Sequence, residues 1–541
     1  MKNTYILVLL IFSSLVFSCN NSPDPSIAPD PEDNGNGEDG NTEEEYNVKI
    51  DLSKTYQTIE SFSASDCWAP NYIGEFWNEK EKEGIAKLLF SKDIDDGQPQ
   101  GIGLSGWRFN LGGGTANQGE ASGIEDKSRR AESFMSPTTG ELDWSKQKGQ
   151  QFFLEQAKHY GCEQLVMFSN TPPVYLTKNK KGYSNSGAFC NIEKSKLPDF
   201  TNYIAKVLSY FKFEKGIDFE LISPVNEPQY EWEGGQEGSG WKNSEIKDLV
   251  VELNKSLVAH DLNTKIMLSE AGDWTYLYKG NNDQSNQINN FFSANSSNYV
   301  GDLSHVAPII AGHSYWTDES WNPMIQVRKT LNESASQKDL KVYQTEWSML
   351  GDKYGAHPDE FVGFDKASYL DIALYMSKVI HCDLTYANVS SWSYWTSMDV
   401  ERWDHKNRFL LIKIEPAGGP YGDIAESGTY EAMKTLWVLG NYSRFIRPNY
   451  KRVDLQMKNY SSKIFGNAFL SPDKNEIVAV YTNTSKLNYT VNFDTSNFKV
   501  KSIKLYTTNE ISNMRESEIT ELNSPIIIQP QSVVTVVYKL K

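Results

Sequence analysis

The first indication of the architecture of this 541-residue chain is one short stretch, Leu221-Ile222-Ser223-Pro224-Val225-Asn226-Glu227-Pro228. The apolar run 219–225 is typical of a buried strand, and Pro228 can neither donate to a sheet ladder nor follow a helical residue easily. The strand is therefore predicted to stop at Glu227, which places a carboxylate at its C-terminal end. The polar, aromatic, Gly-rich run 229–238 is predicted to be a loop. Asn, Glu and Pro also suit an ordinary turn, so the stretch alone leaves a solvated Glu open.

Strand-like and helix-like segments alternate from this stretch in both directions, which is typical of a parallel sheet. Eight strands with helices between them predict an α/β fold, a (β/α)8 TIM barrel. An open doubly wound sheet is the alternative, but Gly112-Gly113-Gly114 opens an irregular loop rather than a phosphate-binding turn. The strands are predicted at 58–66, 103–111, 164–169, 219–225, 265–269, 309–315, 342–346 and 388–395. The clearest helices are predicted at 199–215 (with Asp199 as N-cap), 245–260, 365–381 and 427–439.

The helical period disappears after Asn441, and short alternating β-rich runs take its place. This pattern predicts a β-sandwich over residues 441–541. The run 46–52 alternates in the same way, so an N-terminal strand over 46–56 is expected to join the sandwich before the chain enters a barrel over 57–440. The sandwich strands are predicted at 453–455, 464–470, 477–482, 489–493, 503–507 and 532–540.

The N-terminus is typical of a targeting segment. Lys2 precedes an apolar run over 5–17 that is short for a membrane span, and the run ends at Val16-Phe17-Ser18-Cys19, which resembles the cleavage box of bacterial lipoproteins. An ordinary signal peptide over 1–19 with a chance Cys is the alternative, and both predict export. Residues 20–45 carry nine acidic side chains and no Lys or Arg, and are expected to form a disordered tether. The resulting expectation is an outer-membrane lipoprotein of a Gram-negative bacterium, which contacts the membrane only through its N-terminal lipid.

Composition excludes several classes of function. The net charge is −17 and no Lys/Arg-rich run occurs, so no nucleic-acid partner is expected. The seven His are scattered without a His-Glu-x-x-His or paired Cys-x-x-Cys pattern, so neither a metal nor a cofactor is expected. The Cys outside the signal segment are expected to be mostly buried thiols, and the chain is expected to be a monomer. Fourteen Trp suit a protein that stacks on flat apolar faces.

Functional groups of a (β/α)8 barrel lie at the C-terminal ends of its strands. The predicted strand ends carry mainly hydrogen-bonding and stacking groups, although each one alone could serve packing. Glu270 could support the site or bind substrate, and both Asp66 and Glu270 could equally be solvated turn residues. Besides the carboxylates Glu227 and Glu346, substrate-binding roles are predicted for Asp66, Trp68, Arg108, Asn110, Asn170, Asn226, Trp232, Glu270, His313, Tyr315, Trp392 and Trp395.

Glu227 and Glu346 end the fourth and seventh predicted strands, which face one another across the mouth of an eight-stranded ring. Retaining glycoside hydrolysis needs two carboxyl groups roughly 5–5.5 Å apart, a general acid/base and a nucleophile. Arg108 and His313 would keep a nearby carboxylate ionised, whereas burial would hold an acid protonated. Asn226 would donate to the 2-hydroxyl of the sugar.

Four features in combination resemble glycoside hydrolase family 30. They are the Asn-Glu-Pro of the opening stretch, Gln344-Thr345-Glu346-Trp347, the run 59–66, and a sandwich that takes strands from both ends of the chain. The resemblance covers residue 46 to the C-terminus and implies Glu227 as acid/base and Glu346 as nucleophile. Ser61 and Ser63 stand where the family usually has Gly, and both are expected beneath the site.

The loop after Glu227 is most similar to that of the endo-β-1,6-galactanases of this family. The resemblance therefore implies cleavage of galactan side chains of arabinogalactan. The same mechanism on β-1,6-glucan or β-1,4-xylan is an open alternative. A non-catalytic glycan-binding lipoprotein is a third possibility, and it would be expected to lack one of the two carboxylates.

Overall fold

The computed structural model describes residues 44–541, apart from 186, 188, 351–353, 403–405, 407–408, 459, 495–497 and 523. The predicted signal segment with Cys19, and the tether as far as residue 43, lie outside the described residues. Within the described part of the chain, no helix combines the length and the apolar character needed to cross a bilayer. Cys67, Cys190 and Cys382 are buried free thiols, and the free thiol of Cys162 is half-buried.

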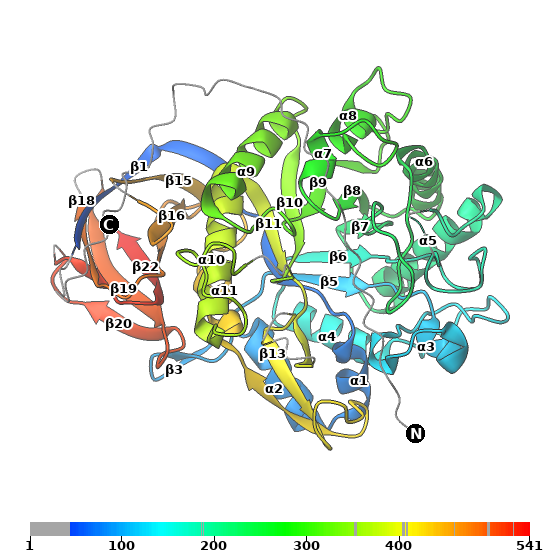
Figure 1. Ribbon diagram of the computed structural model, residues 1–541, viewed down its shortest axis with the longest axis horizontal. Helices are drawn as coiled ribbons and strands as arrows, with labels where there is room; N and C mark the ends of the chain where they lie inside the picture. Colours follow the sequence, from blue (N-terminus) through cyan, green and yellow to red (C-terminus); the bar gives the residue numbers. More distant parts are fainter. Residues whose placement is uncertain are drawn as a thin grey trace, which may run out of the picture. The chain divides into compact units, whose positions relative to one another are not determined.

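Eight parallel strands form a nearly closed barrel, as predicted (Figure 1). They lie in the order β2-β11-β10-β9-β8-β7-β6-β5, and a parallel bridge between Ser65 and Arg108 joins the two ends of the sheet. All eight predicted strands are present, as β2 (Ser61–Ala64), β5 (Gly106–Asn110), β6 (Gln164–Phe168), β7 (Leu221–Ser223), β8 (Lys265–Ala271), β9 (Val306–His313), β10 (Lys341–Trp347) and β11 (Val389–Tyr394).

Helices surround the barrel strands in Figure 1 and bury their apolar faces against them. Burial on both faces explains why the strands read as nearly continuous apolar runs. The helices are α1 (Ala69–Phe76), α2 (Glu79–Phe90), α3 (Thr115–Gln118), α4 (Lys148–His159), α5 (Leu197–Glu214), α6 (Asn243–Ala259), α7 (Thr275–Tyr278), α8 (Gln287–Phe292), α9 (Trp321–Ser336), α10 (Tyr369–Tyr386) and α11 (Lys434–Ser443).

Three helix boundaries differ from those predicted. Helix α5 begins at Leu197, because Pro198 fits its first turn, and Asp199 lies inside that turn rather than at the N-cap. Helix α10 begins after Ser368, which forms a capping box with Asp371. The start of the predicted helix 427–439 is instead the strand β14 (Gly428–Ala432), since its pairing with β13 (Ile412–Pro416) overrides the helical spacing. The strand β12 (Met398–Val400) completes that small sheet, and β3 (Ile94–Asp95) pairs with β4 (Gln98–Pro99).

The C-terminal region is a nine-stranded sheet that also contains the N-terminal strand, as predicted. Strand β1 (Glu44–Thr58) pairs antiparallel with β15 and parallel with β18. Ile503 on β19 and Ile528 on β21 come from opposite ends of the sheet and share one buried core, so the sheet folds over itself as a sandwich. Its remaining strands are β15 (Lys451–Met457), β16 (Ile464–Leu470), β17 (Glu476–Asn483), β18 (Tyr489–Asp494), β19 (Val500–Thr508), β20 (Arg515–Ile519), β21 (Ile526–Ile528) and β22 (Ser532–Leu540).

Buried hydrogen bonds join the barrel to the sandwich. From α10, the Ser377 hydroxyl lies 2.6 Å from the hydroxyl of Thr482 on β17. From α11, the Asn441 amide donates to the Tyr506 carbonyl and the Thr535 hydroxyl, both at 2.9 Å. Because buried polar groups are costly when unpaired, these bonds fix the sandwich against α10 and α11, which pack on β11 and β2 of the barrel.

Candidate active site

A cavity of about 1190 Å³ opens at the C-terminal ends of the barrel strands. Its position agrees with the general rule for this fold, in which function resides at that end of the barrel. The cavity floor contains both predicted carboxylates. Six of the predicted site residues line it, namely Trp68, Glu227, Trp232, Tyr315, Glu346 and Trp395.

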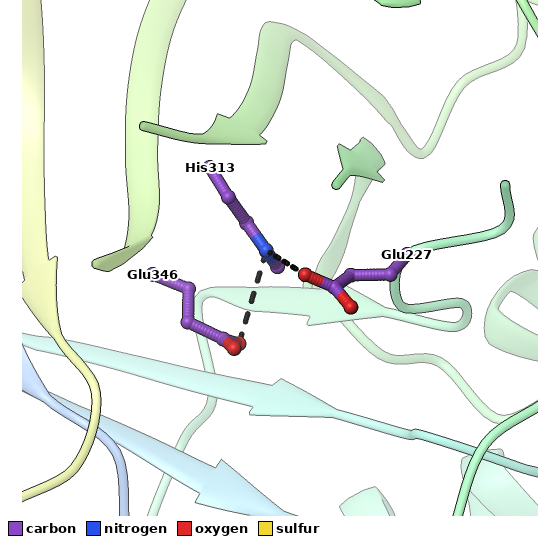
Figure 2. Close-up of side chains that lie close together, drawn as sticks. All are labelled: Glu227, His313 and Glu346. Carbon is purple, nitrogen blue, oxygen red and sulfur yellow. Dashed lines mark hydrogen bonds and ion pairs between the residues drawn. The ribbon is translucent and has the colours of Figure 1, made fainter. Parts of the chain in front are cut away.

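The two carboxylates approach one another from facing strands. Glu227 follows β7 with a φ of 39°, a left-handed conformation that its N–H stabilises by donating to the Glu270 carbonyl at 2.8 Å. Glu346 lies in β10 and is 5% exposed. One oxygen of each carboxylate and one nitrogen of His313 all lie within 4.8 Å of one another. Figure 2 shows the His313 ring reaching both carboxylates from β9.

Glu346 is held by a cation and a hydroxyl. Arg108 Nη1 donates to Glu346 Oε2 at 2.9 Å, and the Tyr315 hydroxyl donates to Oε1 at 3.2 Å. Burial, together with the charge of Glu227, raises the pKa of Glu346 above its ordinary value, and the charges of His313 and Arg108 offset part of this increase. The two cations therefore oppose the effect of burial, which favours the protonated acid.

His313 connects three carboxylates. Its Nδ1 lies 2.9 Å from Glu227 Oε1, and its Nε2 lies 3.3 Å from Glu270 Oε2 and 3.8 Å from Glu346 Oε2. Burial lowers the pKa of His313, but the charge of Glu346 and the hydrogen bonds to Glu227 and Glu270 outweigh it and raise the pKa to about 10. The ring is therefore an imidazolium at neutral pH and donates from both nitrogens.

The protonation state of His313 also affects whether this site could bind a metal ion. Glu227, His313 and Glu346 have a spacing that could accommodate an ion. A metal ligand must be the neutral imidazole, however, and the neighbouring carboxylates raise the pKa of His313 to about 10. In this arrangement the charge that neutralises the two carboxylates is already supplied by His313 and Arg108.

Glu270 is a buried counter-ion rather than a solvated turn residue. Its side chain is fully buried in contact with Arg108 Nη2 at 3.4 Å, and it also accepts from Thr345. Burial raises the pKa of Glu270, but Arg108 and His313 outweigh that effect and lower the pKa to about 2. Glu270 thus orients the two cations that contact Glu346, which is the supporting role predicted as one alternative.

Comparison with known proteins agrees with this geometry. The model of O-glycosyl hydrolase family 30 matches residues 45–409. The chain belongs to glycoside hydrolase family 30. This confirms the predicted family and makes the chain a glycoside hydrolase.

Relatives of this family 30 hydrolase include the endo-beta-1,6-galactanase of Hypocrea rufa, which is 23% identical over 373 residues, or 66% of this chain and 68% of that protein. A conserved exported protein from Bacteroides fragilis is 28% identical, with a TM-score of 0.82 over 91% of this chain and 99% of that structure. The catalytic domain of xylanase C from Talaromyces cellulolyticus shares the fold, with 18% identity and a TM-score of 0.66 over 91% of this chain and 100% of that domain.

Five other predicted site residues of this hydrolase do not line the cavity but lie behind it. Asn226 accepts from Arg108 Nη2 at 3.3 Å, so it contacts the cation that holds Glu346. Asp66 accepts from the Asn110 backbone N–H at 2.7 Å, and the Asn170 amide lies 3.5 Å from the Asn110 side-chain oxygen. Burial raises the pKa of Asp66 to about 8, so this side chain is a structural acceptor rather than a solvated turn residue. The fifth residue, Trp392, differs most from its predicted role.

Trp392 is fully buried, and its indole donates to Asp383 on α10 at 2.9 Å. Its ring therefore packs between the barrel and α10 and has no face open to a sugar. The substrate-binding role predicted for Trp392 is wrong for this reason. Position near a strand end does not reveal which face of the strand a side chain occupies.

Other cavity residues of the hydrolase lie on loops that the strand-end argument did not reach. The Arg129 guanidinium stacks 4.1 Å from the Trp68 ring and pairs with Asp399 at 3.1 Å. Arg402 joins two of these loops by contacting Asp126 Oδ2 at 2.8 Å. No sequence signal marked these residues. Tyr230 and Trp316, in contrast, closely follow predicted strand ends, and their aromatic character was a usable signal.

Proposed function

We propose that this family 30 hydrolase cleaves β-1,6-galactan internally and with retention of anomeric configuration. The single observation that supports retention best is the separation of the two carboxylates, whose nearest oxygens lie within 4.8 Å. Retaining enzymes hold their carboxyl groups roughly 5–5.5 Å apart, whereas inverting enzymes leave roughly 6.5–9.5 Å for a water molecule.

The roles of the two carboxylates follow from their contacts. Glu346 is assigned as the nucleophile because Arg108 and Tyr315 orient its two oxygens, and because Arg108 and His313 oppose the increase in its pKa that burial causes. Glu227 is assigned as the general acid/base because its side chain reaches the cavity and is held through one oxygen by His313 Nδ1, at 2.9 Å. His313 orients Glu227 without shielding its second oxygen.

The first step forms a glycosyl-enzyme ester. Glu346 attacks the anomeric carbon, the bond to the glycosidic oxygen breaks, and Glu227 transfers its proton to that oxygen. In the second step Glu227 takes a proton from water, the water oxygen bonds to the anomeric carbon, and the ester bond to Glu346 breaks. Glu227 is thereby protonated again, so the enzyme returns to its starting state.

The substrate is inferred from similarity. The H. rufa endo-beta-1,6-galactanase supports β-1,6-galactan, and the loop after Glu227 resembles that of the endo-β-1,6-galactanases. β-1,6-glucan and β-1,4-xylan are the alternatives, since an endo-β1,6-glucanase and the T. cellulolyticus xylanase both share the fold. The partner proposed for the cavity is thus a polysaccharide or oligosaccharide, bound by a monomeric enzyme.

Digestion of a substrate panel tests this proposal. The panel holds de-arabinosylated arabinogalactan, β-1,6-glucan and glucuronoxylan, and the products are sized while proton NMR follows the anomer first released. The proposal predicts oligomers from the galactan alone, released first as the β-anomer. Oligomers from glucan or xylan only would reassign the substrate, and release of the α-anomer would exclude the retaining mechanism. No cleavage of any glycan would favour a glycan-binding role.

Export with a lipid anchor is the proposed location. The N-terminal pattern that ends at Cys19 supports it, and the similar B. fragilis protein is described as exported. Labelling with a radioactive fatty acid in a Gram-negative host checks this. Label is expected on the full chain in the outer-membrane fraction and is expected to be lost in Cys19→Ser. A labelled Cys19→Ser variant, or an unlabelled parent chain, would contradict the anchor.

A further inference from the structure

The loop after Glu227 contacts the side of the cavity from which the leaving group departs. In the proposed function, on which this inference rests, Glu227 donates its proton to the leaving-group oxygen, so the first sugar of the leaving group lies beside Glu227. Tyr230 is three residues further along, and its backbone N–H donates to the Glu227 carbonyl at 3.0 Å. Its side chain lines the cavity and is 57% exposed.

A second exposed aromatic side chain, Trp316, lines the same cavity from the end of β9, which is separated from β7 by β8. Trp316 follows Tyr315, whose hydroxyl donates to Glu346, and it is 53% exposed. Its φ of 61° is rare for a bulky residue and is retained only where the surroundings enforce it. Exposure distinguishes Trp316 from Trp68, Trp232 and Trp395, the other Trp residues that line the cavity, which are 4–6% exposed.

The loop that presents Tyr230 is fixed from below. The buried Trp232 ring packs against Tyr230 with the ring centroids 4.8 Å apart, and its indole donates to the Glu227 carbonyl at 3.3 Å. Any Cβ at position 238 would lie 1.9 Å from the Trp232 ring, so only Gly238 allows this close packing. The Tyr230 side chain is therefore held on a preformed support, which lowers the entropic cost of binding a ligand against it.

We propose that Tyr230 and Trp316 form the binding site for the first sugar of the leaving group. The C–H faces of a pyranose match the large, apolar faces of aromatic rings, and half-exposed Tyr and Trp side chains provide such faces at low entropic cost. The ligand class is a neutral pyranoside, since both side chains are uncharged. This site makes cleavage depend on the sugar that leaves as well as on the sugar that is transferred.

Comparison of two substrates tests the site. One is an oligosaccharide of the sugar that the panel identifies, and the other is the corresponding disaccharide fluoride, which places no sugar on the leaving-group side. In Tyr230→Ala and in Trp316→Ala, the ratio of kcat/KM for the oligosaccharide to kcat/KM for the fluoride is expected to fall at least about tenfold. Tyr230→Phe is expected to keep the ratio, because the ring remains.

A matched control is Phe213→Ala, which removes an aromatic side chain that is 62% exposed at the end of α5 and does not line the cavity. It is expected to leave the ratio unchanged. An unchanged ratio in both cavity variants, or an equal loss on both substrates, would overturn the assignment. If the unaltered chain hydrolyses neither substrate, the proposed function fails first, and that result differs from a working enzyme with an unchanged ratio.

Discussion

Arg108 Nη1 donates to Glu346 Oε2 at 2.9 Å across the barrel mouth, although 238 positions separate the two residues in sequence. The guanidinium also contacts Glu270 at 3.4 Å, so Arg108→Met would remove one of the two cations, Arg108 and His313, that contact these buried carboxylates. We expect a loss of about 3–5 kcal/mol in the free energy of unfolding. We also expect roughly 100-fold lower kcat/KM, because Glu346 would lose its orientation.

Arg108→Lys separates charge from geometry at this position. A lysine ammonium keeps the charge but cannot donate to Ser65, Asn226 and both carboxylates in the planar arrangement of Arg108. It is expected to recover part of the stability lost in Arg108→Met and little of the activity. Urea denaturation and steady-state kinetics measure the two quantities, and near-normal kcat/KM in Arg108→Met would contradict the role given to this ion pair.

The two carboxylate variants are expected to fail in different ways. Glu346→Ala removes the proposed nucleophile and is expected to lower kcat by at least about two to three orders of magnitude on every substrate. Glu227→Ala is expected to lose as much on oligosaccharides but less on the fluoride, whose departure needs no proton. Azide should restore turnover in Glu227→Ala, because an anion can attack the glycosyl-enzyme ester without a general base. Equal behaviour of the two variants would argue against these roles.

Stability is expected to fall on the alkaline side because of His313. Its pKa is about 10 in the folded chain and about 6.5 in the unfolded chain, so between these values the folded state binds more protons. The stabilisation from His313 is therefore complete below pH 6.5 and is lost as the pH rises toward 10, at no more than about 1.4 kcal/mol per pH unit.

His313→Gln removes this titration while keeping a side chain that can donate a hydrogen bond. Urea denaturation at several pH values should show a shallower decline in the free energy of unfolding above pH 6.5 than in the unaltered chain. Parallel declines in both proteins would show that the His313 proton does not contribute. His305, whose ring contacts the Thr264 carbonyl on the rim of the barrel, offers a control substitution to Gln.

The strand-end argument predicted much of the site because it depends on local pattern alone. In a parallel barrel every strand runs in the same direction, so the last residues of all the predicted strands lie at the same end of the barrel. That is why Arg108, Glu227, His313 and Glu346 could be placed together from the sequence. The division of the chain into a barrel and a sandwich could also be predicted, because the change from helical to alternating spacing near Asn441 is local.

What the pattern left open depends on tertiary packing. All six residues of β11 are buried, so alternation gives no sign that Trp392 turns toward Asp383 while Trp395 reaches the cavity. Strand β20 was missed because its Arg-Glu-Ser-Glu-Ile sequence is charged and half exposed at the sheet edge. The loop positions of Arg129 and Arg402 depend on contacts between distant segments, for which the sequence carries no period.

Variants of Asp383 and Arg328 test how much this buried ion pair stabilises the structure beneath the barrel mouth. Arg328 Nε donates to Asp383 Oδ1 at 2.7 Å with both side chains fully buried, and Asp383 Oδ2 accepts from Ser314 and Trp392. Asp383→Ala is expected to cost about 3–5 kcal/mol of unfolding free energy, because the buried guanidinium loses its counter-ion. The double variant Arg328→Met with Asp383→Leu should recover part of that loss, and a loss as large as or larger than in Asp383→Ala would contradict this interpretation.

Glu237 is expected to hold in place the loop that carries Tyr230 and Trp232, although it contacts neither catalytic carboxylate. Its buried carboxylate accepts from the Gly113 N–H at 2.7 Å and from the Thr115 N–H and hydroxyl at 3.1 and 2.7 Å. In Glu237→Gln one donor would face the new amide group, so we expect a loss of about 1–3 kcal/mol in unfolding free energy. Because the loop lies on the proposed leaving-group side, KM for oligosaccharides should rise while kcat/KM for the fluoride changes less. Glu233→Gln, on the same loop, is the control for the change in charge. If both variants changed stability and KM equally, the lost charge rather than the lost contacts to Gly113 and Thr115 would be responsible.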